Sequence, residues 1–213
     1  PVIAGNSTFL QNSGILLASK LPMSDKTPVK LRSYGRMRTA VAATVEKDGI
    51  GKIQVICTAL SPLSETEYDG FGESWEDEQM TQIEQILAIP VKEDVVQRVI
   101  LGDFDGNISA GSIREHNPGP VALLEENGWY DPYFDVNYKE DIDCTLCSDN
   151  PFVSDETHDA VPDHIFFMNK DGYEFSSSRI FLNEFVEFND KEMTKTRYSV
   201  SDHYGITTTM TVE

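Results

Sequence analysis

The sequence predicts an α/β protein whose strands form a largely antiparallel or mixed sheet. Short runs rich in β-branched residues alternate with at least one clear helix, and an Asp-Gly turn separates two of those runs. A chain of 213 residues can build one sizeable hydrophobic core. We therefore expect a single domain over residues 1–213.

The runs interpreted as strands are short and end at turn residues. Lys47-Asp48-Gly49 lies between two of them and is typical of a hairpin turn. The predicted strands cover Gly14–Ser19, Arg38–Glu46, Lys52–Ala59, Val95–Leu101, His164–Met168, Arg179–Phe188 and Tyr204–Val212.

The clearest helix is expected from Trp75 to Ile89. Ser74 precedes it as an N-cap, Asp77 is placed for a capping box, and Pro90 ends it. The apolar residues at helical spacing that we expect in the core are Met80, Ile83 and Leu87.

A second, shorter helix is expected near residues 121–127 and ends at Gly128. The loop that follows, from Trp129 to Pro162, is long for a compact domain and rich in Asp, Tyr and Cys. Loops of this length often carry function, so this segment is a candidate region.

The chain is strongly acidic, with 36 Asp and Glu against 17 Lys and Arg and a formal charge of −19. This charge argues against non-specific binding to DNA or RNA, because that affinity comes from cations that neutralise phosphates. A bound divalent cation can invert the field of an acidic cleft, so a nucleic-acid substrate is not excluded. No apolar run approaches the roughly 20 residues of a membrane span.

The chain begins at Pro1 without an initiator Met, signal peptide or transit sequence, so we expect a processed product or part of a longer chain. Two glycosylation sequons, at Asn6 and Asn107, weakly support an extracellular, secreted protein. A glycan on Asn107 would argue against that residue lining an active centre.

Three cysteines leave several interpretations open. Cys144 and Cys147 form a C-x-x-C pair that could be a local disulfide, two free thiols or half of a zinc site. Zinc would need further ligands, and His158 and His164 are the only histidines nearby. Cys57 is expected to be a buried small apolar residue.

Three short acidic motifs lie at strand ends. Asp103 and Asp105 follow a predicted strand, and a strand-end turn can aim both carboxylates at one hard cation such as Mg²⁺ or Ca²⁺. Asp163 precedes an apolar strand, and Asp202-His203 precedes the last one. A carboxylate beside a histidine can serve as a metal ligand with a general acid or base.

An EF-hand is a poor explanation for the first motif. Its position 6 would be Ile108 instead of Gly, and its position 12 would be Arg114 instead of Glu.

Taken in order, LGDF, PDHIFF and SDHYG resemble the endonuclease/exonuclease/phosphatase superfamily, closest to its secreted neutral sphingomyelinase-like and deoxyribonuclease-like members. The strand segments GILLASKLP, from Gly14, and VICTALS, from Val55, are similar to family strands. The segment CTLCSDNP, from Cys144, resembles a loop of sphingomyelinase-like members. The resemblance extends from Gly14 to Thr209.

The resemblance implies a four-layered α-β-β-α sandwich, with two mostly antiparallel sheets packed face to face and helices outside. It also implies metal-dependent phosphodiester hydrolysis, in which a cation, Mg²⁺ or else Ca²⁺ or Mn²⁺, stabilises the developing charge while water attacks phosphorus.

The resemblance also implies roles for individual residues. Asp103 would orient or activate the water, and Asp202, with Asp103, would lie on the metal side. His203 would exchange a proton or contact the phosphate. Asp163 would hold the His203 ring in one tautomer.

Three departures from the family pattern stand out. The family Asn two residues after the first Asp is Asp105 here, and Asn107 is the next candidate. The family His of the C-T-H-L strand is Ala59, and loss of such a phosphate donor costs about 10²–10³ in rate. The first two family strands, with the principal metal-binding Glu, have no match, so we expect a missing or separate N-terminal segment.

Two main hypotheses follow. The first is a secreted phosphodiesterase acting on a phospholipid such as sphingomyelin or on a nucleic acid, with peripheral membrane contact if the aromatics of 129–134 are exposed and not core. The second is a binding or structural module that has lost catalysis, favoured by Ala59 and Asp105. An acidic calcium-dependent adhesion protein is a weaker third.

Overall fold

The computed structural model describes residues 2–3, 14–62, 67–105, 119–136, 143–150, 152–153, 159–180, 186–189, 195–198 and 201–213. The main sheet has five strands in the order β3-β4-β5-β6-β7. These strands are β3 (Met23–Leu31), β4 (Arg38–Lys47), β5 (Gly51–Ala59), β6 (Val95–Asp103) and β7 (Asp163–Phe167).

The sheet is mixed, as the sequence predicts. Neighbours pair antiparallel except β5 and β6, which are parallel and joined through helix α2 (Trp75–Leu87). The hairpin at Asp48-Gly49 is confirmed: Ile50 N donates to Lys47 O over 3.0 Å, and Gly49 has a φ of 80°.

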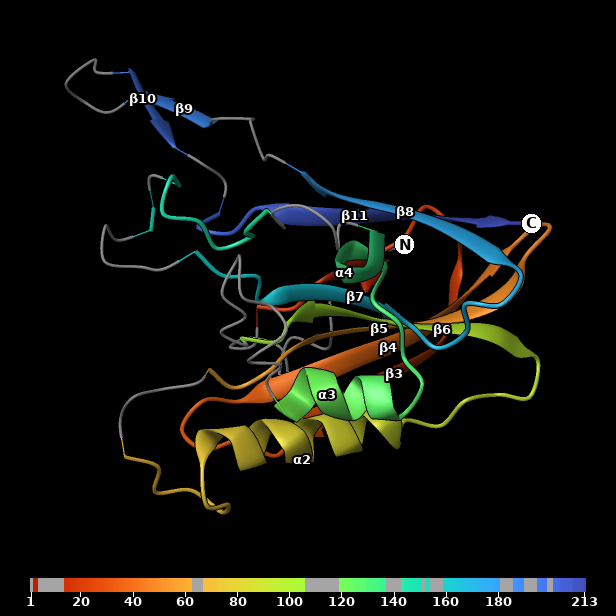
Figure 1. Ribbon diagram of the computed structural model, residues 1–213, viewed down its shortest axis with the longest axis horizontal. Coiled ribbons are helices and arrows are strands. Elements are labelled where there is room, and N and C mark those ends of the chain that lie inside the picture. The colour runs from red at the N-terminus through yellow and green to blue at the C-terminus, as the bar shows by residue number, and fades with distance from the viewer. Residues whose placement is uncertain are drawn as a thin grey trace.

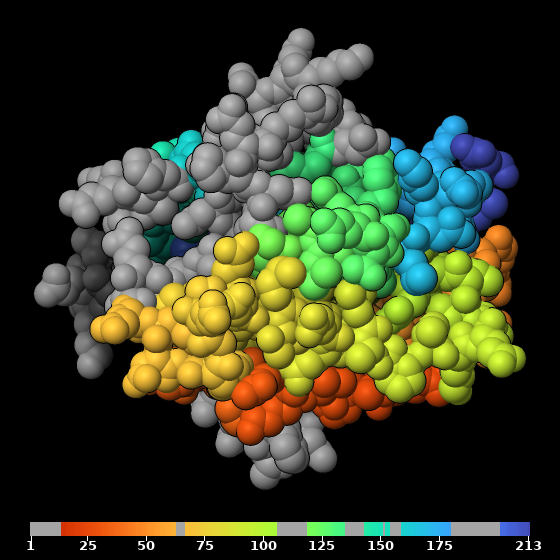
Figure 2. All heavy atoms as spheres, turned by 60° about the horizontal axis from the view of Figure 1, so that its bottom comes forward, coloured from red at the N-terminus to blue at the C-terminus, as the bar shows by residue number. Residues whose placement is uncertain are grey.

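Helices cover one face of the main sheet. Figure 1 shows α2 and α3 (Gly119–Glu126) on one side and the pair β8 (Tyr173–Ile180) and β11 (Gly205–Val212) on the other. The two helices lie side by side on the surface in Figure 2. The core under them contains Leu31, Ile56, Ile83, Ile86, Ile100, Phe104, Leu124, Trp129 and Phe166.

Shorter elements complete the described part of the chain. Helix α4 (Pro132–Val136) lies against β7 and β8 (Figure 1). The remaining strands form two small antiparallel pairs, β1 (Val2–Ile3) with β2 (Leu17–Ala18), and β9 (Val186–Asn189) with β10 (Lys195–Tyr198). The α/β class is thus confirmed, with a five-stranded mixed sheet and a two-stranded sheet of β8 and β11, and the four-layered sandwich stays a prediction.

The buried face of α2 differs from the predicted one. Ser74 caps the helix, as expected, by accepting from Asp77 N over 3.1 Å. Ile83 is fully buried, but Met80 and Leu87 are only partly so, and three polar side chains share the buried face: Glu78, Gln79 and Gln82. The spacing of apolar residues cannot predict a buried helix face that consists partly of Gln and Glu side chains.

Strand β3 has no counterpart in the sequence analysis. It contains Pro28 and several charged residues, which disfavour a strand by pattern alone. The strand lies at the edge of the sheet, where Pro is tolerated because one side of the backbone needs no partner. No helix among the described residues is long and apolar enough to cross a membrane.

Candidate active site

Three strand ends bring the acidic motifs together. In the sheet register, Asp103 at the end of β6 lies opposite Ala59 of β5 and opposite Asp163 at the start of β7. Residues directly opposite in a sheet share a face, so these three positions are neighbours on one surface.

His203 completes the group from the other sheet. It lies just before β11, and its Nδ1 is 2.9 Å from Asp163 Oδ2. This hydrogen bond, with the neighbouring negative charges, raises the pKa of His203 to about 9. The imidazole is therefore positively charged at neutral pH.

The carboxyl groups of Asp103, at the end of β6, and of Asp105, just after it, are destabilised as anions. Burial, and then the charge of Asp163, raises the pKa of Asp103. Burial and the charge of Asp103 raise the pKa of Asp105 to about 6. Asp103 and Asp105 resist ionisation and lie close to Asp163. Such a group of acids is typical of a site that binds a cation.

Local backbone geometry explains why the chain turns here. Gly102 has a φ of 147°, and a Cβ built on it would lie 1.8 Å from Thr58 O. Asp105 N donates to Asp103 Oδ1 over 2.8 Å, and Asp105 itself has a left-handed φ of 47°. The side chain of Asp103 thus closes the turn. The preceding position, 102, accepts only glycine, because any Cβ there would clash with Thr58 O.

A search of solved structures found proteins of the same architecture. An endonuclease/exonuclease/phosphatase from Beutenbergia cavernae matches over 91% of this chain and 46% of its own, with 15% identity and a TM-score of 0.61. SmcL matches over 89% and 66%, with 14% identity and a TM-score of 0.67. TDP2 from D. rerio, complexed with a single-strand DNA product, matches over 89% and 68%, with 16% identity and a TM-score of 0.55.

The chain has the endonuclease/exonuclease/phosphatase fold. It spans only about half to two thirds of the length of these structures. Comparisons with protein-family models and with curated proteins found no match. The resemblance seen in the sequence is therefore confirmed at the level of the superfamily fold.

The other predicted residues fare differently. Asp202 is exposed, accepts a hydrogen bond from Ser201 Oγ over 3.3 Å, and contributes to the raised pKa of His203. Asn107 lies outside the described residues. Ala59 lies beside Asp103 and contributes no polar group.

Arg38 is a candidate that the sequence analysis missed. It opens β4, and its positive charge acts on both Asp103 and Asp105 to lower their pKa values, against the larger effect of burial. Its Nε atom is buried and has no hydrogen-bond partner among the described residues. An arginine at the start of a strand has no sequence signature, because only the sheet register brings it to the β6 end.

His164 lies in the core, although its neighbour in sequence, Asp163, belongs to the candidate site. Its ring is buried, lies 2.8 Å from Asp131 Oδ2 through Nδ1, and stacks against Phe134 and Phe166. It is thus part of the core and takes no part in a zinc site. Asp163, one residue earlier, projects to the opposite side of the strand.

The C-x-x-C pair is a disulfide, which resolves the interpretations left open by the sequence. Of the aromatics of 129–134, Trp129 and Tyr133 are 4% and 2% exposed and pack inside, whereas Tyr130 and Phe134 are half-buried. The two buried rings offer no surface to a membrane.

The carboxylates partly fit a divalent cation. Asp103 and Asp105 supply hard oxygen donors in a region where burial disfavours negative charge, and Asp202, which the resemblance places on the metal side, is exposed next to His203. In the part of the chain that the structure describes, however, no three His, Cys, Asp or Glu side chains are grouped to hold a metal.

Proposed function

We propose that the protein hydrolyses a phosphodiester, with Mg²⁺ or a similar divalent cation as cofactor. The observation that carries this proposal is the 2.9 Å contact between His203 and Asp163, with Asp103 directly opposite Asp163 in the sheet. A charged imidazole beside carboxyl groups of raised pKa provides both a proton donor and a proton acceptor.

Each residue then has a distinct task. Asp103 and Asp105 orient and deprotonate the attacking water, since a pKa of about 6 leaves Asp105 basic at neutral pH. His203, held by Asp163, donates to the phosphate oxygens or to the leaving group. Arg38 supplies a second cationic group, and Asp103 and Asp202 would hold the metal, which neutralises the phosphate charge.

The substrate is an open part of the proposal. The complex of TDP2 with a single-strand DNA product supports a nucleic-acid phosphodiester. A phospholipid such as sphingomyelin is the second candidate, although burial of Trp129 and Tyr133 weakens the argument from membrane-facing aromatics.

Secretion is proposed on the disulfide. The Cys144–Cys147 bond fits an oxidising compartment such as the extracellular space.

The test measures turnover of two substrates in parallel with Mg²⁺ and with EDTA. Phosphocholine release from sphingomyelin liposomes is compared with cleavage of a single-stranded oligonucleotide. Asp103→Asn and His203→Gln should each lower kcat by about 10² or more, whereas Glu84→Gln, on the exposed face of α2, should not. Ala59→His should raise the rate by restoring a phosphate donor.

The alternative is a binding module that retains the fold without catalysis, and Ala59 at the centre of the site favours it. Absence of turnover by both the natural chain and Ala59→His, with any N-terminal segment restored, would contradict the enzyme. Mg²⁺ binding by calorimetry separates the two hypotheses further, since no binding at millimolar metal favours the module.

A further inference from the structure

The disulfide loop has a structural relation to the active-site histidine. Leu146, between Cys144 and Cys147, forms antiparallel bridges to Ala160 on one side and to His203 on the other. Thr145 N donates to Ala160 O over 2.9 Å, and Tyr204 N donates to Thr145 O over 2.7 Å. The loop thus lies as a short central strand between two segments far apart in sequence.

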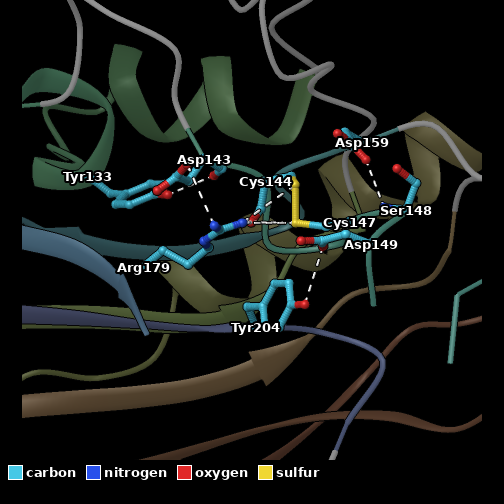
Figure 3. Close-up of a disulfide and its surroundings, with 9 residues drawn as sticks. All are labelled: Tyr133, Asp143, Cys144, Cys147, Ser148, Asp149, Asp159, Arg179 and Tyr204. Carbon is cyan, nitrogen blue, oxygen red and sulfur yellow. Dashed lines mark hydrogen bonds and ion pairs between the residues drawn. A yellow bond between two sulfur atoms is a disulfide. The ribbon is translucent and has the colours of Figure 1, made fainter. Parts of the chain in front are cut away.

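Side chains strengthen the contact with the His203 segment. Asn150 is buried, and its Nδ2 donates to Ser201 O over 3.1 Å. Tyr204 Oη donates to Asp149 Oδ1 over 3.2 Å, a contact drawn in Figure 3. The segment that carries His203 is therefore held on both sides of the histidine.

Arg179 braces the loop from the second sheet. Figure 3 shows its guanidinium pointing at the disulfide, where Nη1 donates to Cys144 O over 3.0 Å and lies 3.2 Å from Cys147 Sγ. The same guanidinium lies 5.1 Å from the centre of the Tyr204 ring. Arg179 is opposite Ile206 of β11 in the sheet, so it joins the loop to the strand after His203.

These contacts lie close in sequence to both partners of the hydrogen bond between His203 and Asp163. Ala160 is three residues before Asp163, and the bridge on the other side of Leu146 is to His203 itself. We propose that the disulfide loop, residues 143–150, is a positioning element that holds the His203 ring against Asp163. The inference rests on the proposed function only for the proton role of His203, because the contact itself can be observed without catalysis.

Two variants test the proposal. Cys144→Ser/Cys147→Ser removes the cross-link, and Asn150→Asp replaces the donor to Ser201 O by an acceptor of the same shape. Both should lower kcat by about 10- to 100-fold with KM changed less than about twofold, because displacement of a catalytic group affects chemistry more than binding. Asn169→Asp, at an exposed position two residues beyond the end of β7, is the matched control and should change neither kcat nor KM.

A second readout does not depend on activity. The proton shared by His203 Nδ1 and Asp163 should give a downfield N–H resonance in NMR, assigned by its loss in His203→Gln. We expect this resonance to broaden or vanish in both loop variants and to persist in Asn169→Asp. If the double serine variant does not fold, Asn150→Asp alone decides.

The outcomes are distinguishable. An unchanged resonance in a folded loop variant overturns the positioning role, and so does an altered resonance with unchanged kcat. If the natural chain turns over no phosphodiester, the proposed function fails, while the resonance still decides whether the loop holds His203.

Discussion

At the scale of single residues, the site depends on side chains whose charge states oppose one another. Burial, and then the charge of Asp163 opposite it, raises the pKa of Asp103, and the hydrogen bond from His203 to Asp163 raises the pKa of His203 to about 9. The carboxylate of Asp163 therefore favours both a protonated His203, which can act as an acid, and a more basic Asp103.

The His203–Asp163 pair predicts a specific pH dependence of stability. Because the folded pKa of His203 is raised, its stabilisation is fully present below the unfolded pKa of about 6.5 and is lost as pH rises through about 9. Asp163→Asn should therefore lower the free energy of unfolding more at pH 6 than at pH 10, measured by urea denaturation. An equal loss at both pH values would show that the hydrogen bond does not couple to the charge of His203.

Gly102 is expected to tolerate no side chain. Gly102→Ala would place a Cβ within 1.8 Å of Thr58 O and force β6 away from β5. We expect a loss of about 2–3 kcal/mol in unfolding free energy. Gly172→Ala is the control: its φ of 77° is also left-handed, but nothing lies within 4 Å, so its loss should be nearer about 1 kcal/mol.

At the scale of elements, helix α2 does more than cover the core. Gln79 Nε2 donates to Ser61 O over 2.6 Å and to Phe104 O over 3.2 Å, which joins the chain after β5 to the chain after β6. Glu78 accepts from Tyr34 N, Ser61 Oγ and Tyr68 Oη. The polar face of this helix thus fixes the two strand ends that border the site.

Gln79→Leu tests this role of α2. Two buried carbonyl oxygens would lose their donor, so the free energy of unfolding should fall by about 1–3 kcal/mol in urea denaturation. Glu84→Gln, exposed on the same helix, should change it by less than about 0.5 kcal/mol. Equal effects of the two substitutions would contradict a positioning role for the buried amide.

At the scale of the whole molecule, a net charge of −19 meets a site that already holds excess negative charge. A raised carboxyl pKa destabilises the folded state above that pKa, and the effect is relieved when the group is protonated or neutralised. Metal binding should therefore stabilise this protein.

The variant Asp105→Asn should distinguish the destabilisation caused by the Asp105 anion from the stabilisation caused by metal binding. Without metal at pH 7.5, it should raise the free energy of unfolding by about 1–2 kcal/mol, since the Asp105 pKa of about 6 makes its anion unfavourable. Millimolar Mg²⁺ should raise the melting temperature of the natural chain more than that of the variant. A variant less stable than the natural chain without metal would refute the repulsion.

The sequence by itself determined the α/β class, the Asp48-Gly49 hairpin, the cap of α2 at Ser74 and the acidic motifs at strand ends. These features depend on residues a few positions apart, so periodicity and turn chemistry reveal them. The family resemblance implied that Asp163 holds His203, whereas only the tertiary structure showed that the charge of Arg38 acts on Asp103 and that His164 belongs to the core. The register between strands sets those contacts, and it depends on packing across the entire sheet and not on any local pattern.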